Sequence, residues 1–264
     1  MGVRLSIFYR NMTLKRNKVA WITGGGTGIG KELALILAKQ EYDVIISGRR
    51  KEKLIETANI YKKRIHPISL DVNNPNQCLK VSKSIYRKFK EIDLLILNAA
   101  IYNQGSITKI STAEAKKVVD INLLGAINVL SPVAKEMQKN KKGHIVFVSS
   151  PAGYQGLPGG GFYGVTKSAL TFLAETLNIE FHKSKIKVQV VDPGFVKTPM
   201  TDQNPFFMPF LMTPQNAAKK IYKKLESKQF EIFFPKKLII PMKLLRLLPY
   251  SIYFFLIKKL IKLP

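Results

Sequence analysis

The chain has 264 residues, 46% of them hydrophobic, and a formal net charge of +26. This apolar content is ample for a buried core, so a disordered chain is excluded, and the length suits one large α/β domain. The single Cys78 excludes a disulfide framework and predicts a reducing, cytoplasmic location. No nucleic-acid motif accompanies the charge, so we expect no nucleic-acid partner, and no metal site is predicted.

Apolar strands alternate with helical patterns along the chain. A short basic extension covers residues 1–17. Strands are expected at 19–23, 43–47, 66–70, 92–97, 143–149, 186–191 and 230–234. Helices are expected from the first glycine turn to about 40, and at 51–62, 76–90, 112–138 and 162–182. Such strands, separated by helices of this length, predict a parallel sheet covered on both faces, which is a doubly wound α/β domain over residues 18–235.

A glycine-rich turn joins the first expected strand to the first helix. Glycines in such a turn let backbone N–H groups approach a pyrophosphate at the positive end of the helix. The turn therefore predicts a dinucleotide cofactor and a Rossmann fold. Its expected cofactor contacts are Thr23, Gly24, Thr27, Gly28, Ile29 and Gly30.

The second expected strand ends without the carboxylate that usually binds the ribose 2′-hydroxyl of NAD. The chain instead reads Ser47-Gly48-Arg49-Arg50-Lys51. Three cations at the start of a helix oppose its macrodipole, so a nearby anion would relieve them. A 2′-phosphate bound by Arg49, with Ser47 or Arg50 assisting, predicts NADP(H) in preference to NAD(H). The alternative is a solvated basic run.

Tyr163 and Lys167 are four residues apart and so share one face of an expected helix. A Lys ammonium near a Tyr hydroxyl favours the phenolate, which lowers the tyrosine pKa toward the range of a general acid/base. Spacing alone proves little, because Tyr86 and Lys90 share it on what reads as a solvated helix face. The case for Tyr163 depends on its surroundings.

Together the glycine turn, the Tyr–Lys pair and the strand–helix alternation resemble the short-chain dehydrogenase/reductase family over residues 18–200. By that resemblance Asp71 and Val72 would contact the adenine. Asn98 and Ala99 match part of a further cofactor motif, in which Ala100 replaces the usual glycine.

Two more motifs of the family complete the expected site. Its active-site Asn is matched by Asn122, and its Ser by Ser150, which lies thirteen residues before Tyr163 and is preferred to Ser149 on that spacing. A later motif holds a Thr that contacts the nicotinamide carboxamide in the family. Its residues here are Pro193, Gly194, Val196 and Thr198.

The resemblance implies an oxidoreductase that transfers hydride between a nicotinamide and a carbonyl or alcohol. Tyr163 would supply the proton, Ser150 would polarise the carbonyl oxygen, and Lys167 would hold the nicotinamide ribose and lower the pKa of Tyr163. Tyr163 and Lys167 would therefore also contact the cofactor, and Asn122 would anchor a water. A homodimer or homotetramer through the helices at 112–138 and 162–182 is expected. The alternative is a non-catalytic cofactor-sensing or scaffolding protein on the same fold.

Residues of about 199–213 stand where the family has its mobile substrate lid. Phe206, Phe207, Phe210 and Leu211 make this stretch apolar. We therefore expect an apolar substrate, of which a lipid-derived carbonyl compound is one candidate. The alternative is that these side chains pack the lid onto the body of the domain.

The tail over 236–264 carries seven Lys/Arg and no acid among many apolar residues. It reads as two short helices broken at Pro249. Its longest uncharged run is 11 residues, against about 20 needed to span a bilayer. Basic and apolar residues together predict a tail that lies peripherally on an anionic membrane surface. Packing on its own domain or across a dimer contact is the alternative.

Overall fold

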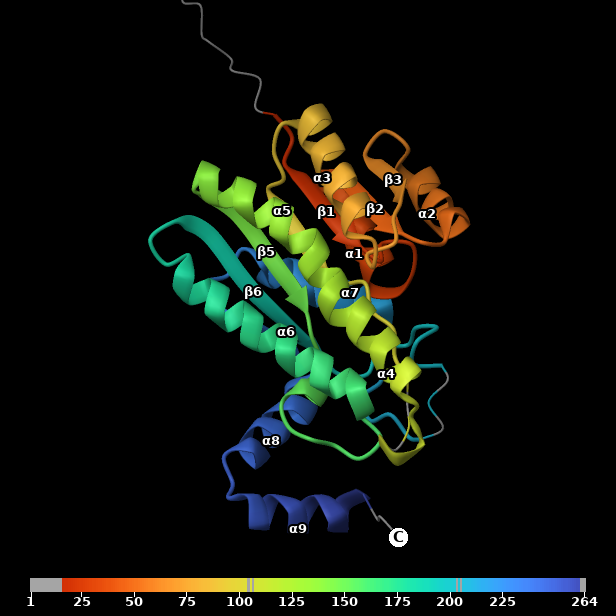
Figure 1. Ribbon diagram of the computed structural model, residues 1–264, viewed down its shortest axis with the longest axis vertical. Helices are drawn as coiled ribbons and strands as arrows, with labels where there is room; N and C mark the ends of the chain where they lie inside the picture. Colours follow the sequence, from red (N-terminus) through yellow and green to blue (C-terminus); the bar gives the residue numbers. More distant parts are fainter. Residues whose placement is uncertain (1–15, 104, 106, 203, 205, 262–264) are drawn as a thin grey trace, which may run out of the picture.

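The computed structural model describes residues 16–261 except 104, 106, 203 and 205. Most of the expected extension over 1–17 therefore lies outside the described residues. The described chain forms a seven-stranded parallel sheet of order β3-β2-β1-β4-β5-β6-β7 with helices on both faces (Figure 1). The strands are β1 (Val19–Thr23), β2 (Asp43–Gly48), β3 (Ile65–Ser69), β4 (Leu94–Leu97), β5 (Lys142–Val148), β6 (Lys185–Pro193) and β7 (Glu231–Phe234). The strand order reverses between β1 and β4, where a crevice for ligands opens in such sheets.

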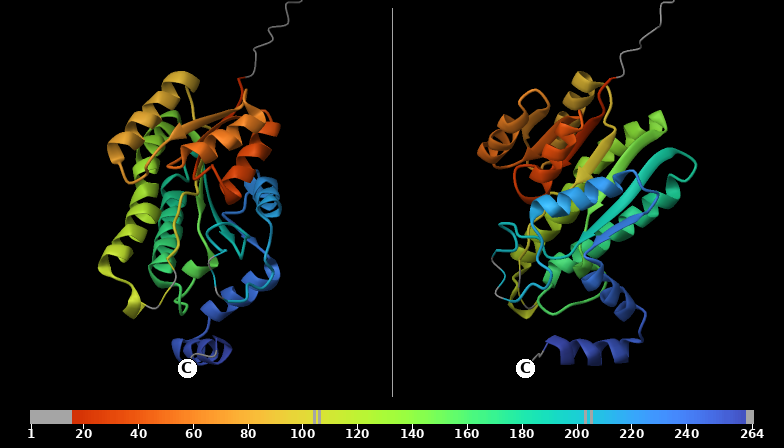
Figure 2. Two further views of the ribbon diagram at one scale, coloured as in Figure 1. Left: turned by 90° about the vertical axis from the view of Figure 1, so that its right-hand side faces the viewer. Right: turned by 180° about the vertical axis from the view of Figure 1, so that it is seen from behind.

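Two helical layers bury the two faces of the sheet (Figure 2). One layer contains α1 (Gly28–Lys39), α2 (Lys51–Ala58) and α7 (Pro214–Leu225). The other contains α3 (Pro75–Phe89), α4 (Thr112–Val119), α5 (Gly125–Asn140) and α6 (Gly161–Glu180). Successive residues of β1 enter opposite cores, with Trp21 in the core under α3, α5 and α6 and Ile22 in the core under α1 and α7. The doubly wound architecture predicted from the alternating pattern is confirmed.

The long helix expected over 112–138 is divided by a π-helical turn, Asp120–Leu124, between α4 and α5. As a whole, 112–140 is the one helix in the described part of the chain with the length and composition to cross a membrane. Val129 and Val133 on its inner face are wholly buried against the sheet. Its position is that of a core helix.

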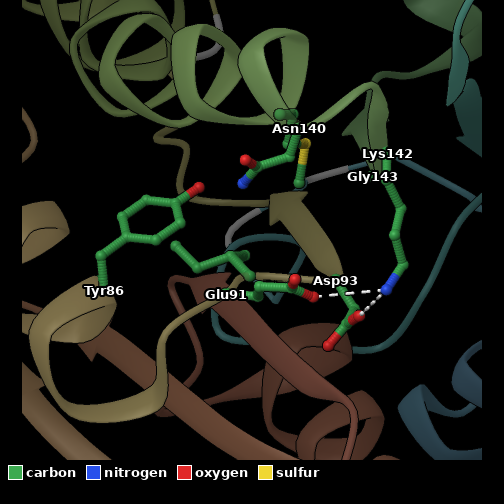
Figure 3. A pocket seen from close by; sticks show the side chains of 8 residues that line it. Tyr86, Glu91, Asp93, Asn140, Lys142 and Gly143 are labelled. Carbon is green, nitrogen blue, oxygen red and sulfur yellow. Dashed lines mark hydrogen bonds and ion pairs between the residues drawn. The ribbon is translucent and has the colours of Figure 1, made fainter.

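Tyr86 differs from the expectation of a solvated helix face. Its ring packs partly buried against the core, and its hydroxyl is enclosed without a hydrogen-bond partner among the described residues. It lines a small pocket at the amino ends of the strands with Asn140, Lys142 and Asp93 (Figure 3). Burial raises the pKa of Tyr86, so this tyrosine keeps its proton.

The tail forms two helices, α8 (Lys236–Arg246) and α9 (Tyr250–Ile261), on either side of Pro249. In α8, Ile239 is fully buried and Lys243 pairs with Glu231 of β7. In α9, the Tyr253 hydroxyl donates to the Gly156 carbonyl at 2.7 Å. One side of the tail therefore packs on the domain. Both helices extend beyond the carboxyl ends of the strands (Figures 1 and 2).

Candidate active site

The glycine turn crosses the carboxyl end of β1 in a conformation that requires glycine. Gly24 and Gly28 have φ of 69° and 56°, which L side chains rarely adopt. At Gly30 a Cβ would lie 2.5 Å from the Gly24 carbonyl oxygen and 2.6 Å from Nδ2 of Asn98. Asn98 donates to the carbonyls of Thr23 and Gly24, at 3.0 and 3.2 Å. The amide of Asn98 therefore fixes the shape of the turn, and its expected contact with the cofactor stays a prediction.

Thr23 and Ala99 contribute to the same fixation. The Thr23 hydroxyl is 2% exposed and accepts from the backbone N–H groups of Asn98 and Ala99, at 3.0 and 3.1 Å. The loop after β4 is therefore bonded directly to the turn after β1. The buried Thr23 side chain therefore supports the turn through hydrogen bonds to the loop after β4.

The amino end of α1 is suited to an anion. Thr27 precedes the helix but does not cap it with its hydroxyl, which accepts instead from Arg50 Nη2 at 3.0 Å. The first turn thus keeps the positive potential of uncapped N–H groups next to the glycines. Among the described residues this arrangement fits the pyrophosphate of a dinucleotide.

The end of β2 presents two arginines and no carboxylate. Arg49 is exposed and has no hydrogen bond or ion pair among the described residues, while Arg50 lies against Thr27. Ser47, expected to assist them, is wholly buried and accepts from Trp21 Nε1 at 3.0 Å. The part of our expectation that placed Ser47 on the phosphate is wrong, because its side chain points into the core.

The remaining expected cofactor residues lie along the same edge. Asp71 and Val72 follow β3, and the Asp71 carboxylate accepts from the Asn73 backbone at 3.0 Å. Gly194, after β6, donates its N–H to the Phe234 carbonyl at 2.7 Å. Beyond Val196, Thr198 reaches the glycine turn, since its methyl carbon would lie 3.0 Å from a Cβ at Gly28.

Ser150, Tyr163 and Lys167 meet where β5 ends and α6 begins. Ser150 follows β5, and its hydroxyl accepts from the Ala152 N–H at 3.2 Å. The same hydroxyl is near enough to the Tyr163 phenol to lower its pKa. Lys167 is 2% exposed, and its ammonium donates to the Val148 carbonyl at 2.8 Å. Its Nζ lies 5.3 Å from the centre of the Tyr163 ring.

Two glycines permit this proximity. A Cβ at Gly153 would lie 2.7 Å from the Ser168 backbone nitrogen, and one at Gly164 would lie 2.8 Å from the Ala152 carbonyl oxygen. The segment after β5 therefore packs backbone to backbone on α6. This contact holds Ser150 opposite Tyr163.

Ser149 has a different environment from Ser150. It is 2% exposed, and its hydroxyl donates to the Lys167 carbonyl at 2.9 Å and lies 3.0 Å from Thr171 Oγ1. Those contacts fasten α6 to the end of β5. Of the two serines, Ser150 is the one that affects the pKa of Tyr163. Its catalytic role stays a prediction.

The pKa values differ from the expectation that Lys167 would lower that of Tyr163. Burial raises the pKa of Tyr163 to about 12, and the nearby Ser150 hydroxyl, as a potential hydrogen-bond donor to the phenolate, opposes the rise. Burial also lowers the pKa of Lys167 to about 8. Desolvation of both groups is the physical reason, because it disfavours the charged form of each.

Asn122 lies in the π-helical turn and is wholly buried. Its amide oxygen accepts from Ile101 N at 2.8 Å, and its Nδ2 donates to the Ile101 carbonyl and to Thr166 Oγ1, at 2.9 and 3.2 Å. The side chain thus joins the loop after β4 to α6. Its expected role in holding a water stays a prediction.

Sequence reasoning missed two neighbours of this cluster. Tyr102 packs edge-to-face on Tyr163, with ring centres 4.9 Å apart. Asp192, near the end of β6, is wholly buried, and neither carboxylate oxygen has a hydrogen-bond partner among the described residues. An acid directly before Pro193-Gly194 was the available signal for Asp192; nothing in the sequence distinguished Tyr102. No group of three potential metal ligands occurs among the described residues.

Comparisons with known proteins agree with this geometry. The family model for short chain dehydrogenases matches residues 18–206. An uncharacterized oxidoreductase of Myxococcus xanthus is 30% identical over 89% of this chain and 94% of its own length. The 3-oxoacyl-[acyl-carrier-protein] reductase FabG of Thermotoga maritima is 33% identical over 71% of this chain and 78% of its own. The solved structure of ElxO with NADP bound is 31% identical, with a TM-score of 0.74 over 82% of this chain and 97% of that one.

The glycine turn yields a test of the site's construction. Gly30→Ala would place a methyl group against the Gly24 carbonyl and Asn98, whereas Gly156→Ala meets no atom within 4 Å. We expect Gly30→Ala to lower the free energy of unfolding by about 1–3 kcal/mol and to weaken NADPH binding. Gly156→Ala should change stability by less than about 0.5 kcal/mol. Denaturant unfolding and NADPH titration measure both; equal behaviour of the two variants would contradict the close approach.

Proposed function

The chain belongs to the short-chain dehydrogenase family, and from that premise we propose that it transfers hydride between NADP(H) and the carbonyl or alcohol of an apolar substrate. The family places it among the NAD(P)-dependent oxidoreductases that act on CH–OH or C=O groups. The observation that carries the proposal is the convergence of Ser150, Tyr163 and Lys167 beside the glycine turn. No described contact favours the sensing or scaffolding alternative.

Each residue has a role that follows from its place. The dinucleotide, when bound, supplies or takes the hydride. Ser150 donates a hydrogen bond to the carbonyl oxygen as negative charge develops on it. Tyr163 keeps its proton until an alkoxide is there to accept it, because burial holds its pKa near 12. Lys167, wholly enclosed, offers its ammonium to the ribose and to the phenolate that Tyr163 leaves behind.

Tyr163→Phe tests the proton donor. Loss of a general acid costs about 10²–10⁴-fold in turnover, while the fold and NADPH binding should remain. Oxidation of NADPH with 2-decanone, acetophenone and a 3-oxooctanoyl thioester is the measurement, and Tyr86→Phe, remote from the site, is the matched control. Turnover by Tyr163→Phe at the wild-type rate would refute the assignment.

The preference for NADP(H) is supported by the end of β2. Arg49 is exposed and unpaired among the described residues, beside a strand end with no carboxylate. The similar protein ElxO has been solved with NADP bound. A 2′-phosphate would form charge-assisted hydrogen bonds with Arg49 and reduce the repulsion among the cations there.

Arg49→Ala tests that preference. Wild type should bind NADPH more tightly than NADH, and the variant should lose about 10–100-fold in NADPH affinity with little change for NADH. Lys83→Ala, an exposed cation on α3, is the control. Dissociation constants from the fluorescence of the single Trp21 measure this; a wild-type preference for NADH would overturn the proposal.

An apolar, lipid-derived substrate is supported by the lid and by a relative's name. Phe206 packs against Phe195, with ring centres 5.9 Å apart, but Phe207 is 87% exposed and Phe210 and Leu211 are about half exposed. Much of the apolar surface of the lid is therefore free to meet a substrate. The Thermotoga relative is named for a substrate with a 3-oxoacyl chain. We infer a substrate with an acyl or comparable apolar body next to its carbonyl.

Peripheral attachment to the cytoplasmic side of a membrane is supported by the outer side of the tail. Large apolar side chains there are exposed, at Leu244, Leu247, Tyr250, Ile252, Phe254, Phe255 and Leu260. The tail carries no acid, and it lies beyond the carboxyl ends of the strands, as the site does (Figure 1). The enzyme would then lie at the membrane surface, where a lipid-derived substrate is found.

The attachment is tested with the full chain. Wild type should sediment with vesicles of phosphatidylglycerol and phosphatidylcholine, and less with phosphatidylcholine alone or at high salt. The double variant Phe255→Glu and Leu260→Glu should stay in solution. The control is Ile55→Glu with Leu79→Glu, which places the same charges on equally apolar but remote positions. Equal sedimentation of both double variants would contradict attachment through the tail.

A homodimer or homotetramer is supported by the outer faces of α5 and α6. Ile127 is 36% exposed, Phe172 72% and Ile179 70%, on the helices expected to associate. Phe172 and Ile179 are seven residues apart and so share one face of α6. Exposed apolar side chains of this kind suit a contact between copies of this chain.

A further inference from the structure

A cluster of charged and polar groups joins β6 and β7 to the tail. Asp192 of β6 and Glu231 of β7 lie on the same face of the sheet, because Asp192 pairs with Phe233 and Val190 with Glu231 in the parallel register. Tyr154, from the segment after β5, donates its hydroxyl to Glu231 Oε1 at 2.5 Å. Lys243 of α8 pairs with the other oxygen of Glu231.

Asp192 is the group in this cluster that lacks a partner. Its side chain is 0% exposed, and neither oxygen is hydrogen-bonded among the described residues, although Glu231 nearby has two partners. A buried carboxyl without hydrogen bonds is costly to keep charged. Its charge also acts on the two central residues of the proposed site, Lys167 and Tyr163.

We propose that Asp192 is a positioning residue of the active site, and that Glu231 and Lys243 control its charge and, through it, the charge of Lys167. Helix α8, the first helix of the tail, would thereby influence proton transfer at the site. The proposal rests on the proposed function, in which Lys167 must be cationic.

The directions of the couplings follow from the cluster. Burial first, and Glu231 second, raise the pKa of Asp192 to about 8, whereas Lys243 and Lys167 lower it. A charged Asp192 in turn raises the pKa of Lys167. Asp192 and Lys167 therefore titrate in the same pH range, so that a negative Asp192 keeps Lys167 protonated at higher pH.

Activity should fall at high pH as Lys167 loses its proton, and we call this part of the pH profile the alkaline limb. Variants of the cluster should shift the pH of this fall, some to lower pH and one to higher pH. Asp192→Asn removes the charge that supports Lys167, so the limb should shift to lower pH by about 0.5–1 unit. Lys243→Met leaves Asp192 protonated to higher pH and should shift it the same way. Glu231→Gln lets Asp192 ionise sooner and should shift it to higher pH. Lys237→Met, an exposed lysine on the same helix, should leave it in place.

The pH profile of NADPH oxidation with 2-decanone, or with the most active ketone of the panel, gives the limb for each variant. Opposite shifts for Glu231→Gln and Lys243→Met support the proposal. Coincident limbs, or shifts of one sign for all three cluster variants, overturn it, because damage to folding alone would not reverse sign. Circular dichroism confirms that each variant is folded.

A second measurement needs neither cofactor nor substrate. The pKa of Asp192 is raised from 3.8 to about 8, so its contribution to stability is present below about pH 4 and is lost as pH rises toward 8. The unfolding midpoint of wild type should therefore fall more between pH 5 and 9 than that of Asp192→Asn. Parallel curves would overturn the proposal. Retained turnover by Tyr163→Phe would instead overturn the proposed function, so the two failures are distinguishable.

Discussion

The burial of one ammonium group, that of Lys167, is the constraint on which this site depends. A cation taken out of water needs a nearby oxygen atom, and the carbonyl of Val148 at the end of β5 supplies one. The pKa of Lys167 is raised whenever Asp192 of β6 is charged. Val148 and Asp192 both lie near the carboxyl ends of parallel strands, so the sheet brings them to the same edge. The same burial lowers the pKa of Lys167 and raises that of Tyr163. The chemistry of the pair therefore comes from its enclosure as much as from its spacing.

Close backbone contacts at glycines hold the other segments of the site in place. Gly153 and Gly164 let the segment after β5 lie against α6, and Gly30 lets α1 lie against the loop after β4. Asn98 and Asn122 then fasten that loop to the glycine turn and to α6. The glycine turn and the start of α6 are thus both fastened to one loop, the loop after β4.

Much of this could be predicted from the sequence because the determinants are local. Fully apolar strands and regular helices predicted the parallel sheet, and residue spacing favoured Ser150 over Ser149. The misses have a different origin. Ser47 was placed on the phosphate because sequence shows position but not which way a strand residue points, and here it faces Trp21. Tyr86 was placed in solvent for the same reason. The pKa of Tyr163 was expected to fall because spacing reveals a neighbouring cation and hides the desolvation that outweighs it.

The pairing of Glu231 with Lys243 has a consequence for how the protein is made. A chain leaves the ribosome from its amino end, so β1 to β7 can assemble before α8 has emerged. During that interval Glu231 stands beside Asp192 without its lysine, and two carboxyl groups face one another in a nearly finished sheet. Helix α8, which is synthesised after the whole sheet, supplies the compensating cation. A chain that stops after β7 would therefore keep most of its sheet but carry an unbalanced acidic pair at the position of its chemistry.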